Sequence, residues 1–398
     1  VKRAPPLEPL SDMRHLSVPK RQTQFFIDAL KERDWFPTGY RVLPDGECSL
    51  VPIAESAPEK LSSPFTEIPI VIEAQDPPSP KDWIAHLPNY ISTSIIDEHK
   101  GIWPNSQEHY GDIILFKIER EIEQYAQQVA LAKMDHSLKT RLILRDHGVS
   151  GEYRVRMLEP LAARSEDGIL NAEEILSLPD EIKTRLTSTR VSVKENGTSI
   201  LLDPSTAYYS SRLASERERT VFSAMELRNL LSRPLSIADP YCGVGPAVLQ
   251  LLNQENLVGD LLACDINPHA VELLMENIGD VSEDWFIGVE DATTLENIAE
   301  LVNRFDLLLM NLPHETLAHL PHLLPLLKTS GPTTVRGWAV VEEQNLQSFE
   351  NQLNETLSEH ASLNERVQPS IRRQYNTTKV LVRFEARYGD SINHPRHP

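Results

Sequence analysis

Apolar runs of strand length alternate with runs of helical length between about residue 205 and residue 327, and this alternation is the strongest constraint on the fold. The strand-like runs, each bounded by polar turns, are LSIAD, LLACDI, DWFIGVED and FDLLLMN. The helical patterns are PAVLQLLNQ, PHAVELLMENI, TLENIAELVN and HETLAHLPHLLPLL. Strands that alternate with helices of about 10–15 residues are typical of a parallel, doubly wound sheet with helices on both faces.

The C-terminal part of the chain changes this order. TTVRGWAVVEE predicts a strand, NLQSFENQLNETLSEH a helix, and RVQPSIRRQ and TKVLVRFEARY two strands that can pair directly as a hairpin. An antiparallel strand at the edge of a mostly parallel sheet is a common variation. The pattern therefore predicts an α/β domain over residues 205–387, with a Rossmann-like, mostly parallel sheet and an antiparallel C-terminal strand.

Polar residues and glycines follow the four parallel strands of this domain. They are Asp239, Gly243, Gly245, Asp265, Asp291 and Asn311, and Pro313 follows the last of them. Each of them taken alone is also explained as a helix cap or a turn residue. Because ligands of open α/β sheets bind beyond the carboxyl ends of the strands, the set as a whole predicts a nucleoside pocket. Asp265 lies 20 residues after Gly245, where an acidic side chain can bond both hydroxyl groups of a ribose.

The glycine loop indicates which nucleoside fits. The dinucleotide fingerprint requires a third glycine at position 248, where this chain has Val248. We therefore expect S-adenosylmethionine rather than NAD, held by the residues at the strand ends. The three cysteines, Cys48, Cys242 and Cys264, are far apart and form no CxxC pair, so neither a metal site nor a disulfide framework is expected.

A small unit is expected at residues 12–56, before the α/β domain. It combines a short strand, RHLSVP, with the amphipathic segment KRQTQFFIDALKERDW and a hairpin that turns at Asp45-Gly46. The following residues, 57–79, are rich in proline, serine and charge, which is typical of a linker.

Residues 80–204 predict a middle α+β domain. Its strands are GDIILFKI, TRLILRDHGV and GEYRVRMLEPL, and EREIEQYAQQVALAKM predicts a helix. Residues 165–188 are an acidic inserted segment, and a hairpin that turns at Asn196-Gly197 ends the domain.

Several of these motifs resemble the tRNA (guanine-37-N1)-methyltransferase family of the non-knotted, class I type. DPYCGVGP, DINPHAVELL and MNLP are similar to its cofactor motifs, and GEYRVRMLEPLA (151–162) and AYYSSRLASERER (207–219) are more diagnostic. The resemblance covers roughly residues 14–387, with the linker and residues 165–188 as departures. It implies a class I methyltransferase fold and an enzyme that methylates N1 of guanosine 37 in tRNA with S-adenosylmethionine, while residues 12–56 recognise the body of the tRNA.

The resemblance also implies roles for individual side chains. Glu216 is expected to be the general base for the N1 proton, and Arg154 is expected to stabilise the charge that develops on O6. Tyr208 is expected to pack on the target base, and Asn311 to orient its edge. The arginines expected to bind the tRNA substrate are Arg145, Arg156 and Arg212.

Each of these side chains also has a simpler explanation. The SERERT segment around Glu216 fits a solvated helix face with alternating charges. If YRVRM is a strand, Arg154 and Arg156 lie on one face, where both are explained as surface charges. Tyr208 also fits a core or an interface. Ser211 stands where the family commonly has proline, which makes that turn less rigid without removing a catalytic group.

The charge of the chain is the main argument against a nucleic-acid substrate. The formal net charge is −19, whereas phosphate contacts dominate the affinity of proteins for nucleic acids. Basic residues nevertheless cluster in and around the diagnostic segments. They are Lys139, Arg141, Arg145, Arg154, Arg156, Arg212, Arg217 and Arg219, with Arg372 and Arg373 as a further pair. A tRNA bound to such a patch is expected to bind with strong dependence on salt.

Other functions stay open. A sister enzyme of the wybutosine pathway transfers an aminocarboxypropyl group to the same tRNA position. In that family we expect an SPGN-like turn in the segment that corresponds to residues 208–216, where this chain has SSRLASE. Some relatives also methylate a tricyclic guanosine derivative. Amino-methyltransferases carry an N-P-P-Y motif, whereas Leu312 and His314 replace two of its residues here. A non-catalytic RNA-binding adaptor with a relic cofactor fold is a further alternative, but the intact set Asp265, Asn311, Arg154 and Glu216 argues against it.

No run of 18 apolar residues appears, and the first residues lack the apolar core of a signal peptide. We therefore expect a cytoplasmic protein without a membrane segment. No obligate protein partner is evident, and a monomer is expected.

Overall fold

The computed structural model describes residues 11–37, 39–75, 82–151 and 153–389. These residues belong to two units. The first takes the chain up to Trp103, together with 119–140 and 162–177. The second takes Pro104–Ile118, Arg141–Leu161 and the chain from Leu178 onward.

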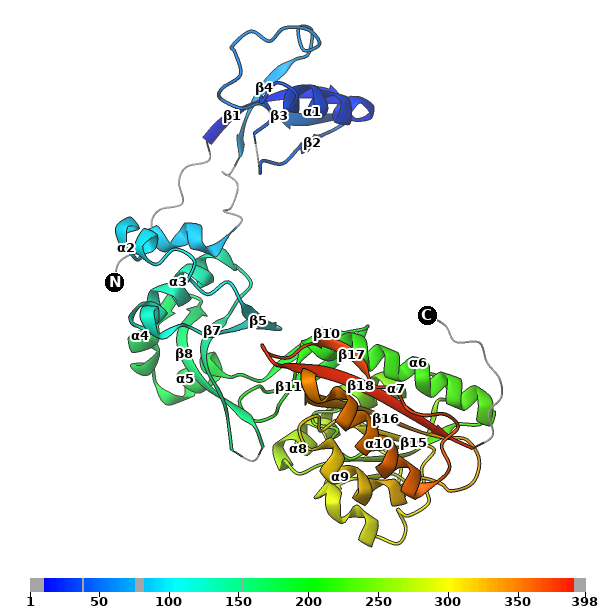
Figure 1. Cartoon of the computed structure of the whole chain (residues 1–398). Coiled ribbons are helices and arrows are strands. Elements are labelled where there is room, and N and C mark those ends of the chain that lie inside the picture. The colour runs from blue at the N-terminus through cyan, green and yellow to red at the C-terminus, as the bar shows by residue number, and fades with distance from the viewer. Residues whose placement is uncertain (1–10, 38, 76–81, 152, 390–398) are drawn as a thin grey trace. The chain divides into compact units, whose positions relative to one another are not determined.

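The first unit begins with an antiparallel sheet covered by one helix (Figure 1). The strand order is β2-β3-β1-β4, and the helix is α1. Their bounds are β1 Ser11–Pro19, α1 Thr23–Lys31, β2 Leu43–Asp45, β3 Cys48–Pro52 and β4 Ile70–Gln75. Phe26 and Leu30 of α1 pack against Leu16 and Val51 of the sheet. The predicted hairpin between β2 and β3 is confirmed.

Strand β4 lies in the segment that was expected to be a linker. It pairs antiparallel with β1, with Ile72 opposite Arg14. Leu61 and Phe65, from the same segment, are buried in the core of this sheet and helix. The expectation of a linker is therefore wrong up to Gln75, because proline and serine in this segment accompany a strand whose partner is distant in the sequence. The rest of the expected linker, residues 76–79, lies outside the described residues.

A mixed sheet of order β5-β6-β7-β8-β9 forms within residues 107–171, apart from residue 152, which is not described. Strands β6 and β7 pair in parallel, whereas β5 is antiparallel to β6 and β9 to β8. The bounds are β5 Gln107–Tyr110, β6 Ile113–Phe116, β7 Leu142–Ser150, β8 Val155–Ser165 and β9 Gly168–Asn171. The helical elements of this part of the chain are η2 Trp83–Asn89, α2 Thr93–Glu98, η3 Arg120–Tyr125 and α3 Ala126–His136.

The acidic segment 165–188 is regular structure. It contains β9 and two helices, α4 Ala172–Leu176 and α5 Asp180–Thr187. Asn171 and Glu174 form a reciprocal capping box at the start of α4.

The hairpin of β10 (Val191–Glu195) and β11 (Thr198–Leu202) is confirmed, because Asn196 and Gly197 both have positive φ angles, 47° and 81°. Asn277 attaches it to the α/β domain by bonding both backbone groups of Leu201 and the carbonyl of Val244.

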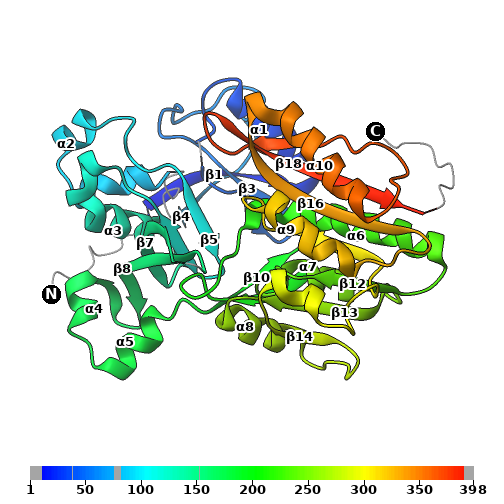
Figure 2. The same ribbon diagram turned by 60° about the horizontal axis from the view of Figure 1, so that its bottom comes forward.

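The predicted α/β sheet is confirmed within residues 235–388. Its order is β14-β13-β12-β15-β16-β18-β17, in which β14 to β16 are parallel, while β18 is antiparallel to β16 and to β17 (Figure 2). The bounds are β12 Leu235–Asp239, β13 Val258–Asp265, β14 Phe286–Val289, β15 Leu307–Met310, β16 Thr333–Glu342, β17 Ser370–Gln374 and β18 Lys379–Tyr388.

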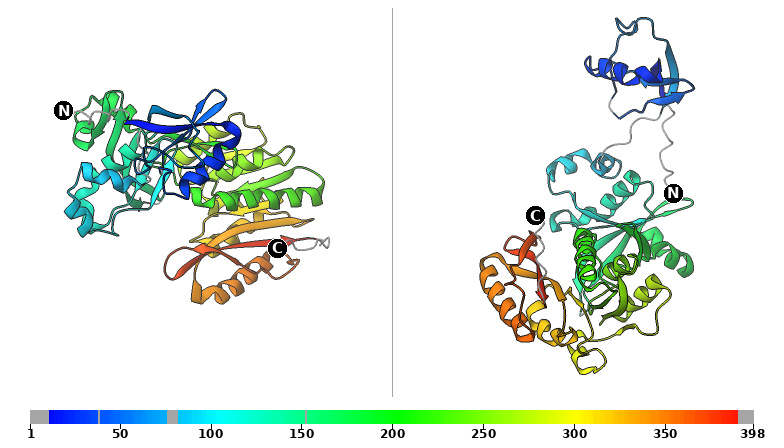
Figure 3. Two further views of the ribbon diagram at one scale, coloured as in Figure 1. Left: turned by 90° about the horizontal axis from the view of Figure 1, so that it is seen from above. Right: turned by 90° about the vertical axis from the view of Figure 1, so that its right-hand side faces the viewer.

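Helices cover both faces of this sheet (Figure 3). On one face are α6 Ala214–Leu231, α7 Pro246–Leu252 and α8 Pro268–Ile278. On the other face are η5 Ala292–Asn297, α9 Thr316–Leu323 and α10 Leu346–His360. The segment TLENIAELVN, expected to be a helix, forms only the end of the 3₁₀ turn η5, because Asp291 caps a short turn between two strands. None of the helices in the described ranges is long and apolar enough to cross a membrane.

Candidate active site

The loop after β12 has the backbone shape that its glycines predict. Gly243 and Gly245 have positive φ angles of 55° and 85°. A Cβ atom at Gly245 would lie 2.4 Å from Leu274 Cδ1, so helix α8 packs where a side chain would be. The amide of Gly243 donates to Asp265 Oδ2 at 2.9 Å. The loop is therefore fixed to the end of the neighbouring strand β13.

The Asp265 carboxylate is held by backbone amides at the end of β13. Its Oδ1 atom accepts from the amide of Asn267 at 3.0 Å. Burial raises its pKa, while the amides of Asn267, Gly243 and Ile266 act in the opposite direction. These amides fix the orientation of the carboxylate at the place where a ribose was expected. The side chain is only partly buried.

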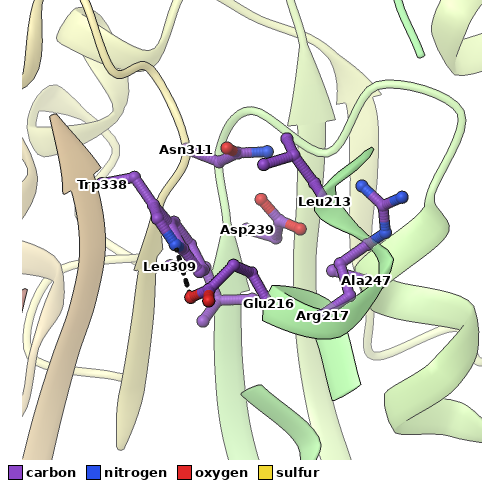
Figure 4. Close-up of a pocket in the computed structure, with 8 residues that line it drawn as sticks. All are labelled: Leu213, Glu216, Arg217, Asp239, Ala247, Leu309, Asn311 and Trp338. Atoms are coloured by element: carbon purple, nitrogen blue, oxygen red, sulfur yellow. Dashed lines mark hydrogen bonds between the residues drawn. The ribbon is translucent and has the colours of Figure 1, made fainter. Parts of the chain in front are cut away.

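A pocket of about 330 Å³, including its opening, lies beside this loop. Its lining residues are Leu213, Glu216, Arg217, Asp239, Ala247, Leu309, Asn311 and Trp338. Three residues expected from the sequence, Glu216, Asp239 and Asn311, are thus brought together from α6 and from the ends of β12 and β15. In Figure 4 their polar groups surround one space, and the dashed line marks the hydrogen bond from Trp338 to Glu216.

Asp239 is the most deeply buried acid of the pocket, with 2% of its surface exposed. Burial raises its pKa to about 7, helped by the charge of Asp265 and opposed by the amide of Tyr241. Among the described residues, no group donates a hydrogen bond to its Oδ1 atom. A buried acceptor without a partner is costly, so this atom is suited to a donor group on a ligand.

Replacing Asp239 by Asn is expected to stabilise the ligand-free protein at alkaline pH. The folded-state pKa of Asp239, about 7, lies above its ordinary value of 3.8, so the stability it contributes is complete below pH 3.8 and is lost as the pH rises through 7. The amide does not ionise, and the variant should exceed the parent by about 2–4 kcal/mol at pH 8. Urea denaturation between pH 5 and pH 8 measures the difference. The exposed Asp280→Asn change is the control, and a difference for Asp239→Asn that does not grow with pH would contradict the prediction.

Glu216 is buried on α6 and surrounded by donors. Its Oε1 atom accepts from Arg372 Nε at 2.7 Å, and its Oε2 atom accepts from Trp338 Nε1 at 3.1 Å. Arg383 lies 3.5 Å from Oε2. Burial alone would raise the pKa of Glu216, but the hydrogen bonds from Trp338 and Arg372 and the charges of Arg383 and Arg372 lower it below its ordinary value. The alternative of a solvated helix face is therefore wrong at this position, and Glu216 is an ionised carboxylate on the wall of the pocket.

A second buried carboxylate, Glu195, organises the segment before α6. It accepts from Tyr209 Oη at 2.6 Å and from Gln250 Nε2 at 2.6 Å, and it forms a two-point ion pair with Arg217. Arg217 also donates to the carbonyl of Ser210. Arg217 was expected in a basic patch and Glu195 was not identified from the sequence, because nothing local marks a pair 22 residues apart.

The arginines expected to bind substrate differ in availability. Arg156 is held between Asp146 and Glu108, at 2.6 and 2.8 Å. Arg212 is more exposed, and it lies 3.3 Å from the second oxygen of Glu108. Arg145, on β7, lies 3.8 Å from Glu159. In this structure Arg156 therefore positions Glu108, and through it Arg212, whereas Arg212 has its guanidinium at the surface.

Arg154 does not lie on a strand. It precedes β8 in a turn with φ +51°, so the expectation that Arg154 and Arg156 share one strand face is wrong. The turn arises because the chain must reverse between β7 and β8. The guanidinium is exposed and bonds to none of the described residues, but its charge lowers the pKa of His314. Since His314 follows the MNLP segment, Arg154 and the loop after β15 are electrostatic neighbours.

The other expected site residues lie around the pocket rather than in its lining. Tyr208 is 47% exposed, and its carbonyl oxygen is 3.8 Å from the Cβ position of Gly243. Pro313 accepts a hydrogen bond from the amide of Val340, which fixes the loop after β15 to β16. Asp291 is exposed and caps η5, where its Oδ1 atom accepts from the amide and the hydroxyl of Thr293.

Comparisons with known proteins identify relatives of this chain. Residues 191–359 match the model of the TRM5/TYW2 methyltransferase domain, and residues 87–165 match that of the TYW2 N-terminal domain. The tRNA (guanine(37)-N(1))-methyltransferase Trm5b of Pyrococcus abyssi is 25% identical over 314 residues, which cover 76% of this chain and 78% of that protein. The enzyme of the same name from Methanocaldococcus jannaschii is 29% identical over 189 residues, or 46% and 44% of the two chains. A solved complex of aTrm5 and tRNALeu has a similar fold, with a TM-score of 0.65, 20% identity and coverage of 94% and 99%.

Proposed function

Because the chain belongs to the TRM5/TYW2 methyltransferase family, we propose that it transfers the methyl group of S-adenosylmethionine to N1 of guanosine 37 in tRNA. The observation that carries this proposal is the pocket beside the glycine loop. It combines a buried, ionised carboxylate, Glu216, with Asp239 and Asn311 at the carboxyl ends of β12 and β15. A base for the N1 proton and a cofactor site are thus adjacent.

The loop and the strand ends fit S-adenosylmethionine. The partnerless Oδ1 atom of Asp239 can accept from a cationic amino group, and the fixed carboxylate of Asp265 can accept from ribose hydroxyls. Gly243 and Gly245 keep the loop free of side chains. When bound, S-adenosylmethionine supplies an electrophilic methyl group. We place Asp291, which is exposed and caps η5, at the outer edge of this site.

The remaining steps belong to side chains of the protein. Glu216 accepts the N1 proton, and the electron pair left on N1 becomes available to the methyl group. Arg154 stabilises the negative charge that moves onto O6. Tyr208, which is half-exposed at the glycine loop, stacks on the target base, and Asn311 bonds its edge. Arg212 and Arg145 bind the RNA near the site.

Replacing Asp265 by Ala is expected to weaken S-adenosylmethionine binding by about 1–3 kcal/mol, because two hydrogen bonds to the ribose are lost. Titration calorimetry with the cofactor alone measures this change without any tRNA. Asp280→Ala, an exposed acid beyond the end of α8, is the control. An unchanged affinity of the Asp265→Ala variant would remove Asp265 from the cofactor site.

The decisive experiment is mass spectrometry of a tRNA transcript with guanosine 37 after incubation with the protein and S-adenosylmethionine. A methylated nucleoside at that position, and none in a transcript with adenosine 37, is the expected result. The match of residues 87–165 to the TYW2 N-terminal domain favours one second candidate, transfer of the aminocarboxypropyl group. The same spectra separate the two, because the two added groups differ in mass. A transcript that carries the tricyclic guanosine derivative tests whether the protein also methylates that base.

The unit of β1–β4 and α1 is proposed to recognise the body of the tRNA. The substrate follows from the tRNA in the solved complex of aTrm5, which has a similar fold. We propose that the protein acts as a monomer.

A further inference from the structure

Four arginine side chains gather around the carboxylate of Glu216. They come from four elements and are Arg219 of α6, Arg336 of β16, Arg372 of β17 and Arg383 of β18. Arg372 and Arg383 form ion pairs with Glu216, while Arg336 pairs with Glu385. Arg219 acts on Arg336 and Arg383 through its charge. We call these four residues the arginine cluster.

The arginine cluster carries more positive charge than its carboxylates neutralise. Three guanidinium groups pair with Glu216 and Glu385, and Arg219 adds a fourth positive charge that acts on two of them. Arg387 pairs with both Glu385 and Glu226. Arg336 is 3% exposed, and its Nη2 atom has no hydrogen-bond partner among the described residues. Burial, together with the like charges of the neighbouring arginines, lowers the pKa of Arg383. A buried donor without a partner inside a positive field is the arrangement that an anion stabilises.

Arg372 is placed where it can move. It lies on the edge strand β17 at a bulge, because Ile371 pairs with Val382 and Arg373 with Leu381, so that Arg372 has no residue opposite it. A bulge changes the direction of a side chain and leaves the residue outside the ladder. The side chain of Arg372 is 24% exposed, whereas that of Glu216 is 7% exposed. Arg372 can therefore turn toward solvent without breaking a backbone hydrogen bond between β17 and β18.

We propose that the arginine cluster binds a backbone phosphate of the RNA, and that this phosphate takes Arg372 away from Glu216. The inference rests on the proposed function and adds the event that makes Glu216 basic. A phosphate offers a guanidinium two parallel, charge-assisted hydrogen bonds, as a carboxylate does. In the RNA-free protein Arg372 occupies the Oε1 atom of Glu216. Once Arg372 bonds the phosphate, Oε1 is free to receive the N1 proton, while Trp338 keeps its bond to Oε2.

The charged groups around Glu216 determine how its basicity changes. Arg372, Arg383 and Arg336 favour the ionised form of Glu216. Arg219 faces this group through its charge on Arg336 and Arg383, and Asp239 lines the same pocket. A bound phosphate neutralises part of this positive charge, so proton affinity rises when RNA arrives. The pH dependence of kcat/KM, which reports the free protein, should therefore differ from that of kcat, which reports the complex.

The first test measures RNA binding by the full chain without chemistry. Fluorescence anisotropy with an anticodon stem-loop RNA is recorded for the parent and for Arg372→Gln over a series of salt concentrations. The variant should bind about tenfold more weakly, as expected for one lost charge-assisted contact. The slope of log affinity against log salt should fall by about 0.7, the value for one phosphate of a single strand.

The matched control is Arg304→Gln, which removes the same charge from the amino ends of the strands, where Arg304 pairs with Asp260. It should leave the affinity and the slope unchanged, and Arg372→Lys should restore part of the affinity. Thermal unfolding and cofactor calorimetry show whether each variant is folded. Unchanged RNA affinity and slope in the Arg372→Gln variant overturn the phosphate site, whether or not the protein methylates tRNA.

The second test asks whether Arg372 leaves Glu216. With saturating tRNA, the acid limb of single-turnover methyl transfer by Arg372→Gln should lie at the same pH as that of the parent, because Arg372 is already displaced in the parent complex. An acid limb that moves to higher pH in the variant shows that Arg372 remains on Glu216 during the reaction and overturns the release. If the parent protein binds RNA but transfers no methyl group, only the proposed function is refuted and the phosphate site stands.

Discussion

The Glu216→Gln variant is expected to transfer methyl groups about 10²–10⁴-fold more slowly than the parent in a single turnover. Glutamine keeps the size of the side chain and can still accept the hydrogen bond from Trp338, but it cannot take up the N1 proton. Because the carboxylate is buried beside the cofactor loop, no exposed acid can replace it. Rapid quench with saturating tRNA and cofactor measures the step directly and avoids masking by slow product release.

The control for this variant is Glu218→Gln, an exposed acid two residues further along the same helix. It should retain the rate of the parent, and both variants should bind S-adenosylmethionine normally. A Glu216→Gln variant that reacts within about twofold of the parent, far short of the loss for a general base, would place the base elsewhere.

The lowered pKa of Glu216 changes the pH dependence that a carboxylate base would otherwise give. A group with a depressed pKa is ionised above that value and loses its charge as the pH falls through it. In the free protein this occurs below the ordinary value of 4.5, so kcat/KM should show no rise from Glu216 between pH 5 and pH 8. An acid limb in that range of the kcat/KM profile has to come from another group, and Asp239, with a pKa of about 7, is the candidate in the pocket.

The parallel sheet could be predicted because its information is local. LSIAD, LLACDI and FDLLLMN are short apolar runs, and the polar residue that ends each one lies at the same edge of any parallel sheet. Asp239, Asp265 and Asn311 therefore came out at neighbouring strand ends without knowledge of the strand order.

Elements whose partners are distant could not be predicted in the same way. Helix α6 buries Glu216, Arg217 and Thr220 along with apolar residues of its second half, so its inward face is partly polar and no continuous apolar stripe marks it. The ion pairs of Arg217 with Glu195, and of Arg372 with Glu216, join residues 22 and 156 positions apart. A charge that is buried against such a partner looks like a surface charge in the sequence.

Arg154→Ala is expected to slow single-turnover methyl transfer by about 10²–10³-fold, the usual cost of removing one electrostatic donor from a transition state. The side chain is suited to this role because it is exposed and bonds to none of the described residues, so no carboxylate has to be displaced before it reaches O6. Alanine leaves the turn as it is, since both residues carry a Cβ atom at the same positive φ angle. The cofactor affinity of the variant should not change.

The pKa of His314 provides a second measurement for this variant that does not depend on methyl transfer. Burial, Arg154 and Lys379 together lower the pKa of His314, so the Arg154→Ala change should raise the pKa of His314 toward its ordinary value in a titration followed by NMR. Arg304→Ala, at the opposite edge of the sheet, should leave that pKa and the rate unchanged. If Arg154→Ala weakens tRNA binding but keeps the rate at saturation within about twofold, Arg154 holds the RNA and does not stabilise O6, because a group that acts only on the transition state lowers the rate at saturation.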